Sequence, residues 1–67
     1  MLSKTSSVIR YIDYDYSTKT LNITFVSGKR YRYINVPESI YLGLNNAYSK
    51  GTYFNSYIKG HYRNHRM

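Results

Sequence analysis

LNITFVSGKRYRYINVP, residues 21–37, is the stretch of the chain that decides its fold. Apolar side chains occupy every second position over Leu21–Phe25, which is the period-two pattern of a half-buried strand. Arginines and tyrosines alternate over Arg30–Tyr33, and Ser27-Gly28 between the two runs indicates a hairpin. The stretch therefore predicts two antiparallel strands joined by a short loop.

The number of residues in that loop decides which side chains face the core. A two-residue loop would place Arg30 and Arg32 beside the apolar residues of the preceding strand. A three-residue loop, Val26-Ser27-Gly28 with glycine in the left-handed region, instead sets the two tyrosines opposite Ile23 and Leu21. We therefore expect the three-residue loop, with both arginines on the face that points away from the core.

The flanking sequence supplies one more strand and a helix. β-Branched and aromatic residues predict a first strand over residues 7–14, although adjacent apolar pairs blur its alternation. Pro37 suits the first position of a helix, and Glu38 complements the positive end of the helix dipole. The apolar face of this helix is predicted to comprise Ile40, Tyr41, Leu44, Ala47 and Tyr48.

A second helix follows Ser49-Lys50-Gly51, whose glycine suits the C-terminus of the first helix. Its apolar side is predicted to comprise Tyr53, Phe54, Tyr57, Ile58 and Tyr62. We expect the polar residues 64–67 to be disordered. The sequence thus predicts an α+β fold, a three-stranded antiparallel β-meander followed by two short C-terminal helices, in the order β-β-β-α-α, packed on one sheet face. The 67 residues are predicted to form one domain, residues 1–67, with an ordered core over about 7–62.

The charge balance points to a polyanionic partner. Ten Lys and Arg residues stand against three acids, which gives a formal net charge of +7 and a sequence pI near 9.8. Such an excess in a small domain is typical of nucleic-acid binding, although a solvated basic surface that serves solubility is the alternative. No segment has the apolar length of a membrane span, so we expect no membrane partner. The chain has no cysteine, which fits a reducing cytoplasm.

Short motifs spread over most of the chain carry a resemblance to a known family. They are Ser6-Ser7-Val8-Ile9, Tyr14-Asp15, Phe25 with Ser27-Gly28, Tyr31-Arg32-Tyr33, Val36-Pro37, Tyr41-Leu42, Leu44, Ala47, Ser49-Lys50-Gly51-Thr52-Tyr53-Phe54-Asn55 and Ile58. In these motifs the chain resembles the KTSC domain family of short bacterial and phage proteins and C-terminal extensions of some lysyl-tRNA synthetases. The synthetase context implies RNA binding. The lack of cysteine and of a membrane span leads us to expect a cytoplasmic location, in the host cytoplasm if the chain is phage-encoded.

Catalysis has little support in the sequence. The three carboxylates lie on separate predicted elements, whereas acid–base chemistry needs two that converge on one cleft. His61 and His65 have the four-residue spacing of metal ligands on a helix, but no third ligand is near in sequence. We therefore expect no enzymatic activity, no cofactor and no metal.

The best candidate site is the turn before the second helix. If a helix starts there, the free N–H groups of Gly51, Thr52 and Tyr53 point outward at its positive end, and Lys50 adds a full charge. The hydroxyl groups of Ser49 and Thr52 can also donate to a phosphate. The alternative is a glycine hinge capped by Ser49 that needs no ligand.

Further candidate residues extend this site. Basic side chains expected to supply an attractive field are Lys59, Arg63, Arg30 and Arg32. Tyr53 is the predicted stacking ring, and for a small nucleotide in a pocket the loss of Tyr53 or Asn55 should matter as much as the loss of Lys50. Tyr31 and Tyr33 could stack on bases, but the predicted register favours a core role for them.

Three functions remain open at this point. The first is non-enzymatic binding of a phosphate-bearing nucleotide ligand, with RNA as the preferred ligand. The second is a phage-type sponge that sequesters a small nucleotide immune signal, such as an ADP-ribose-derived or cyclic nucleotide, in the pocket of an oligomer. The third is a protein–protein interaction module. The small core and the uncovered sheet edge or face suggest a homodimer or a higher homo-oligomer.

Overall fold

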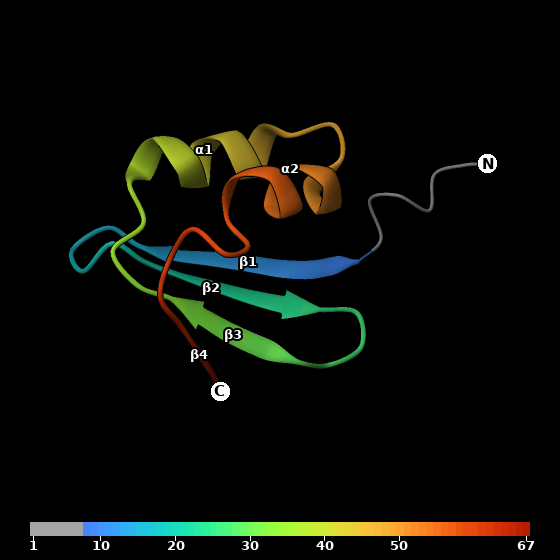
Figure 1. Ribbon diagram of the computed structural model, residues 1–67, viewed down its shortest axis with the longest axis horizontal. Helices are drawn as coiled ribbons and strands as arrows, with labels where there is room; N and C mark the ends of the chain where they lie inside the picture. The colour runs from blue at the N-terminus through green and yellow to red at the C-terminus, as the bar shows by residue number, and fades with distance from the viewer. Residues whose placement is uncertain (1–7) are drawn as a thin grey trace.

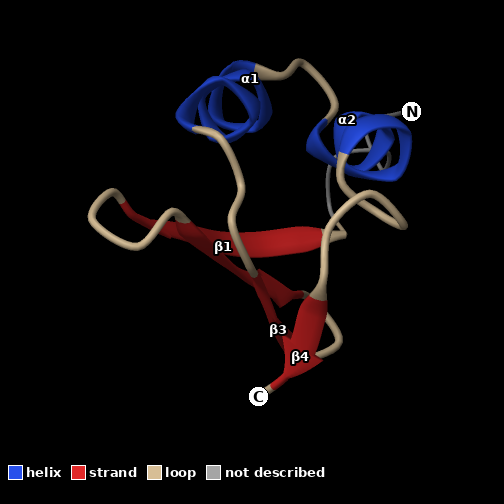
Figure 2. Cartoon of the chain, turned by 60° about the vertical axis from the view of Figure 1, so that its left-hand side comes forward, coloured by secondary structure: helices blue, strands red, loops and turns tan. Residues whose placement is uncertain are grey.

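The chain folds into an antiparallel sheet with two helices on one face, in a computed structural model that describes residues 8–67 (Figure 1). The sheet order is β1 (Ile9–Asp15), β2 (Thr20–Phe25), β3 (Arg30–Tyr33) and β4 (Asn64–Arg66). The helices α1 (Glu38–Asn46) and α2 (Lys50–Tyr57) connect β3 to β4. Both lie on the same side of the sheet, which leaves the other face open (Figure 2). The predicted α+β fold is confirmed, and Ser7, predicted to begin the first strand, lies outside the described residues.

The hairpin between β2 and β3 has the predicted register. Leu21 pairs with Tyr33, and Ile23 pairs with Tyr31. The loop has three residues, because the Phe25 N–H donates to the Lys29 carbonyl at 2.8 Å and closes the ladder there. Gly28 has a φ of 95°, a left-handed conformation in which glycine is favoured. Arg30 and Arg32 are exposed, as the parity of the loop predicted.

A β-bulge explains the blurred alternation of the first strand. Ile9 pairs with Phe25, but Tyr11 pairs with Thr24, so Arg10 is an extra residue in the ladder. Beyond this extra residue, the side chains of β1 again alternate between the two faces of the sheet. As a result Ile9 and Tyr14 are both buried on the helix side of the sheet, whereas Tyr11 points to the open face and is 67% exposed.

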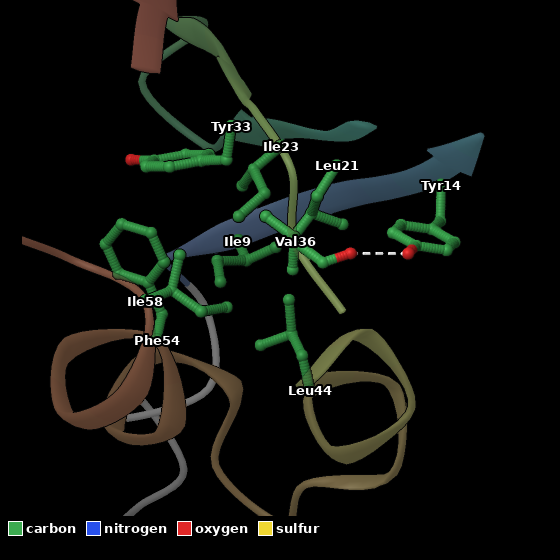
Figure 3. Packing of buried hydrophobic residues seen from close by; sticks show 9 residues of the cluster. All are labelled: Ile9, Tyr14, Leu21, Ile23, Tyr33, Val36, Leu44, Phe54 and Ile58. Carbon is green, nitrogen blue, oxygen red and sulfur yellow. Dashed lines mark hydrogen bonds between the residues drawn. The ribbon is translucent and has the colours of Figure 1, made fainter. Parts of the chain in front are cut away.

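The core lies between the sheet and the helices (Figure 3). Nine buried residues form it: Ile9, Tyr14, Leu21, Ile23, Tyr33, Val36, Leu44, Phe54 and Ile58. Val36, which follows β3, carries its carbonyl to the edge of this cluster, where the Tyr14 hydroxyl donates a hydrogen bond to it. That bond ties β1 to the segment that leads into α1.

The first helix ends earlier than its apolar pattern predicts. Ala47 is extended and caps α1, so the helix stops at Asn46 and Tyr48 is 99% exposed. The prediction that Tyr48 belongs to the apolar face of this helix is therefore wrong. Gly51, which was predicted to end α1, is instead buried in the first turn of α2. Tyr57, assigned to the apolar side of the second helix, is 53% exposed.

The C-terminal residues form an edge strand. The prediction of disorder over residues 64–67 is wrong, because Asn64 pairs with Tyr33 and Arg66 pairs with Tyr31. Two further backbone bonds of 2.8 Å extend the ladder, from the Ile34 N–H to the Arg63 carbonyl and from the Met67 N–H to the Arg30 carbonyl. Within residues 8–67, no helix is both long enough and apolar enough to cross a membrane.

Candidate functional site

A groove of about 440 Å³ runs between α2 and the β3 side of the sheet. We call it the α2–β3 groove; its lining residues are Val8, Phe25, Tyr31, Tyr33, Gly51, Phe54, Asn55, Lys59 and Asn64. Its volume is within the range of small-molecule sites, and its walls have the usual composition of such sites, aromatic side chains with a few polar groups. A hollow of about 500 Å³ lies on the open face of the sheet, but its only aromatic residue is Tyr11.

Four aromatic rings form the floor of the groove, and each ring contacts two of the others. Phe25 contacts Tyr31 at 5.9 Å and Phe54 at 5.4 Å between ring centroids, both edge-to-face. Tyr33 contacts Phe54 at 5.7 Å and Tyr31 at 6.4 Å. This aromatic quartet joins both strands of the hairpin to α2. Its edge-to-face contacts hold the floor in one arrangement before any ligand arrives.

The two tyrosines of the quartet differ in accessibility. Tyr33 is 5% exposed, and its ring packs against Phe54 at one side of the core (Figure 3). Burial, and secondarily the neighbouring Tyr31, raises the pKa of the Tyr33 hydroxyl above its ordinary value of 10.0. Tyr31 is only half-buried and lines the groove, so its ring is the one that a ligand can reach. The sequence prediction that both tyrosines are core rings therefore holds fully only for Tyr33.

Helix α2 supplies one polar wall of the groove. Asn55 lies on the helix, and Lys59 follows one turn later, where the Ile58 and Lys59 N–H groups both donate to the Phe54 carbonyl at 2.9 Å. Gly60 then reverses the chain with a φ of 80°. These bonds fix Lys59 at the rim of the groove, so a flexible ammonium group stands beside an aromatic floor.

Strand β4 supplies the opposite wall. Asn64 lines the groove, and Arg66, paired with Tyr31, lies on the same side of the sheet as the quartet. Neither residue is predicted by the sequence, because a three-residue polar strand shows no apolar alternation. The only signal for β4 is the unpaired edge of the Tyr-Arg-Tyr strand, which needs a partner or a cover.

The turn before α2 does not present the free amides that the sequence suggested. The Ser49 hydroxyl accepts from the Thr52 N–H at 3.3 Å, and the Ser49 carbonyl accepts from the Tyr53 N–H at 3.1 Å. The Ser49 hydroxyl also donates to the Thr52 hydroxyl at 3.0 Å. Two of the three proposed phosphate donors are thus occupied by the helix cap. Lys50 is half-buried beside this turn and does not line the groove.

Tyr53 serves the packing of the two helices rather than the groove. Its ring lies against Gly43 of α1, where a Cβ atom added to the glycine would come within 2.6 Å of Tyr53 Cζ. It also contacts Tyr57 at 4.6 Å between ring centroids. The half-buried tyrosine that lines the groove is therefore Tyr31 rather than the predicted Tyr53.

The remaining predicted residues lie elsewhere. Arg30 and Arg32 are on the open face, across the sheet from the groove. Arg63 borders a separate hollow with His61. The structure thus brings together Gly51, Asn55 and Lys59 and separates them from the other seven predicted residues. His61 lies in a turn and His65 in β4, so they do not share a helix, and no group of three metal-binding side chains occurs within residues 8–67.

Comparison with known proteins agrees with the fold. The KTSC domain family model matches residues 5–62. The crystal structure of a KTSC domain protein from Yersinia pestis superposes with a TM-score of 0.89 at 33% identity, and the match covers 98% of this chain and 93% of that one.

Sequence relatives fall into two kinds. A lysine–tRNA ligase of Nostoc punctiforme is 44% identical over 63 residues, which is 94% of this chain but 11% of the ligase. An uncharacterised protein of Stutzerimonas stutzeri is 40% identical over 63 residues, and the match covers 92% of this chain and 89% of that protein. The chain therefore resembles a small part of the first relative and nearly the whole of the second.

Proposed function

This chain belongs to the KTSC domain family, and we propose that it is a non-enzymatic module that binds single-stranded RNA. Its similarity to a segment of proteins named lysine–tRNA ligases supports this proposal. The observation that carries the proposal is the aromatic floor of the α2–β3 groove with amide and cationic side chains on its walls. One base stacks on Tyr31. Asn55 and Asn64 form hydrogen bonds with its edge, and Lys59 and Arg66 hold the flanking phosphates.

Each part of the groove fits one part of a nucleotide. Proteins bind unpaired bases by stacking them on aromatic rings and by forming hydrogen bonds to their exposed edges. Stacking contributes about 1–3 kcal/mol per base and tolerates any base, because every base has a π-face. A side-chain amide carries both donors and an acceptor, so Asn55 and Asn64 can match several base edges. The net charge of +7 adds the long-range attraction that a polyanion requires.

A small nucleotide is the second candidate ligand, and the volume of the groove favours it. A hollow of about 440 Å³ is within the range of sites that hold a single small molecule. The two ligands differ in the number of phosphates that the protein contacts. For single-stranded RNA, the logarithm of the affinity falls with the logarithm of the salt concentration by about 0.7 per phosphate contact, whereas a small nucleotide in a closed pocket gives a shallow slope.

The first prediction tests the groove with a labelled single-stranded RNA of about eight nucleotides, a length within the usual site size. Fluorescence anisotropy measures the affinity at several salt concentrations. Lys59→Ala is expected to weaken binding roughly tenfold to a hundredfold, the effect of losing a charge-assisted contact of about 1.5–3 kcal/mol. It should also reduce the salt slope by about 0.7. Tyr31→Leu keeps an apolar contact with the quartet but loses the stacking face, and we expect a loss of at least about fivefold.

Lys19→Ala is the matched control, because it removes one positive charge from the turn between β1 and β2, far from the groove in sequence and in the sheet. It should change the affinity less than twofold, about 0.4 kcal/mol. Equal losses for Lys59→Ala and Lys19→Ala would show that binding follows net charge alone and would overturn the assignment to the groove. If no RNA or nucleotide binds, the protein-interaction function takes first place.

A further inference from the structure

The helices leave one face of the sheet uncovered (Figure 2). The strand pairing places two rows of side chains across this face. We call this surface the open face. One row is Asp13, Asn22, Arg32 and His65, in the order of the strands. The other is Tyr11, Thr24, Arg30 and Met67, in which the last pair is joined by the bond from the Met67 N–H to the Arg30 carbonyl. Directly paired residues point to the same side of a sheet, so each row is continuous.

Charge is distributed unevenly along these rows. The β1 side of the open face carries the carboxylates of Asp13 and Asp15, and the β3 side carries the guanidinium groups of Arg30 and Arg32. All four are exposed. A surface that is negative along one edge and positive toward the other is complementary to a copy of itself turned end for end.

We propose that two copies of the chain pack with their open faces together, about a two-fold axis parallel to the strands. This axis places β1 of one copy over β4 of the second copy, and β2 over β3. Asp13 then faces His65 of the second copy and lies within reach of its Arg32, because neighbouring strands are only about 4.8 Å apart. The contact is isologous, so each charge pair forms twice.

Asn22, in the first row, does not add to this contact. Asn22 Oδ1 is buried without a hydrogen-bond partner, the only such side-chain atom found in residues 8–67. Its Nδ2 donates to Asp13 at 3.4 Å, so the amide is oriented with its oxygen toward the β3 side. Its oxygen is already covered by the chain's own atoms, so Arg32 of the second copy cannot reach it, and the contact along this row comes from Asp13, Arg32 and His65.

The second row supports the same axis through its apolar ends. Tyr11 is 67% exposed and Met67 is 45% exposed, and they lie at opposite ends of the row. The axis brings each Tyr11 ring against Met67 of the second copy. Contact between a thioether and an aromatic ring is favourable by about 0.3–1.5 kcal/mol, and burying both side chains adds a hydrophobic contribution.

A second copy suits the open face better than RNA does. Asp13 and Asp15 would repel the phosphates of any strand that crossed all four β-strands, whereas they attract the arginines of a second copy. The α2–β3 groove is on the other face of the sheet, so dimer formation leaves both grooves accessible.

Sedimentation velocity between about 1 and 500 µM tests the proposal through a charge exchange, over the range in which a weak dimer of this kind dissociates. The wild-type chain should approach twice its mass of 8.0 kDa. Asp13→Arg places arginine against Arg32 of the second copy, and Arg32→Asp places aspartate against Asp13. Each variant alone should therefore lose at least about tenfold in dimer affinity. An equimolar mixture of the two variants should regain the dimer, because each chain then supplies the charge that the other lacks.

Recovery in the mixture excludes misfolding as the cause of the loss. Wild-type chain that stays at 8.0 kDa throughout the range overturns the proposal, as does a variant that dimerises as tightly as wild type. If both variants are monomeric, have the far-UV circular dichroism of wild type and stay monomeric when mixed, the proposal is also overturned. If their spectra differ from wild type, the same test is made with the variants Asp13→Lys and Arg32→Glu. RNA anisotropy with Asp13→Arg separates this proposal from the groove, because adding Tyr31→Leu should weaken RNA binding in this monomeric variant by the same factor as in wild type.

Discussion

Single side chains in this protein combine two physical roles, and Tyr14 shows the consequence most clearly. Its ring stacks on Tyr41 at 4.6 Å with an interplanar angle of 5°, and its hydroxyl donates to the Val36 carbonyl. Burial raises the pKa of the Tyr14 hydroxyl above its ordinary value of 10.0, and Glu38 and Tyr16 add to the rise. The buried ring and the hydrogen bond to the backbone therefore both depend on a protonated hydroxyl.

The pKa of Tyr14 predicts a loss of stability in alkali. The folded state holds the proton more tightly than the unfolded state, so its contribution is fully present below pH 10 and is lost as the pH rises through the folded-state pKa. Chemical denaturation between pH 7 and pH 12 measures the free energy of unfolding across this loss. Tyr14→Phe should lower the free energy of unfolding by about 1 kcal/mol at pH 7, through the lost hydrogen bond. It should also reduce the fall of that free energy at alkaline pH. Tyr11→Phe, at an exposed position, is the matched control and should change the free energy of unfolding at pH 7 less than Tyr14→Phe does.

At the scale of elements, α2 depends on a cap and on its fit against α1. Ser49→Ala removes the acceptor of the Thr52 N–H and should destabilise the fold by about 1 kcal/mol. A change of that size lowers the melting temperature by roughly 4–8 °C in a domain of this length. The RNA affinity of the folded variant should stay within about twofold of wild type, because Ser49 does not line the groove. A loss comparable to that of Lys59→Ala would instead return the phosphate site to the turn.

Gly43 allows the two helices to approach each other. Gly43→Ala would place its Cβ within 2.9 Å of Tyr53 Cε2, closer than packed atoms tolerate, and should cost about 1–3 kcal/mol. Tyr53→Leu in the same chain removes the obstructing end of the ring and should recover part of that loss. Thermal melts of the two single variants and the double variant give the coupling energy. Additive losses would contradict the predicted contact.

At the scale of the whole molecule, sequence reasoning succeeded where a periodic pattern meets a geometric constraint. The parity of the loop at Gly28 fixed the register of β2 and β3, because a shift by one residue would have buried two arginines. Sequence reasoning did not predict β4, because the pairing of this strand depends on an edge strand that is distant in sequence.

The same limit explains the outcome for the candidate site. Hydrogen-bond donors at the turn before α2 were visible in the sequence, but their use by the Ser49 cap depends on local geometry. The α2–β3 groove is assembled from five separated parts of the chain, at Val8, at Phe25, at Tyr31 and Tyr33, over residues 51–59 and at Asn64. No single window of sequence contains it. The sequence named Asn55 and Lys59 as candidate residues, but only the fold shows that they meet the tyrosine strand.

The aromatic quartet also gives the protein an optical signature. The chain has ten tyrosines and no tryptophan, so its near-ultraviolet spectrum comes from tyrosine and phenylalanine alone. Rings held in fixed asymmetric contacts produce near-ultraviolet circular dichroism, and mobile rings do not. Tyr31 belongs to this rigid set and also lines the groove, so a ligand that stacks on it perturbs the spectrum directly. Because nucleic-acid bases absorb in the same region, occupancy of the groove by RNA is read as the difference between the spectrum of the complex and the sum of the spectra of its two components.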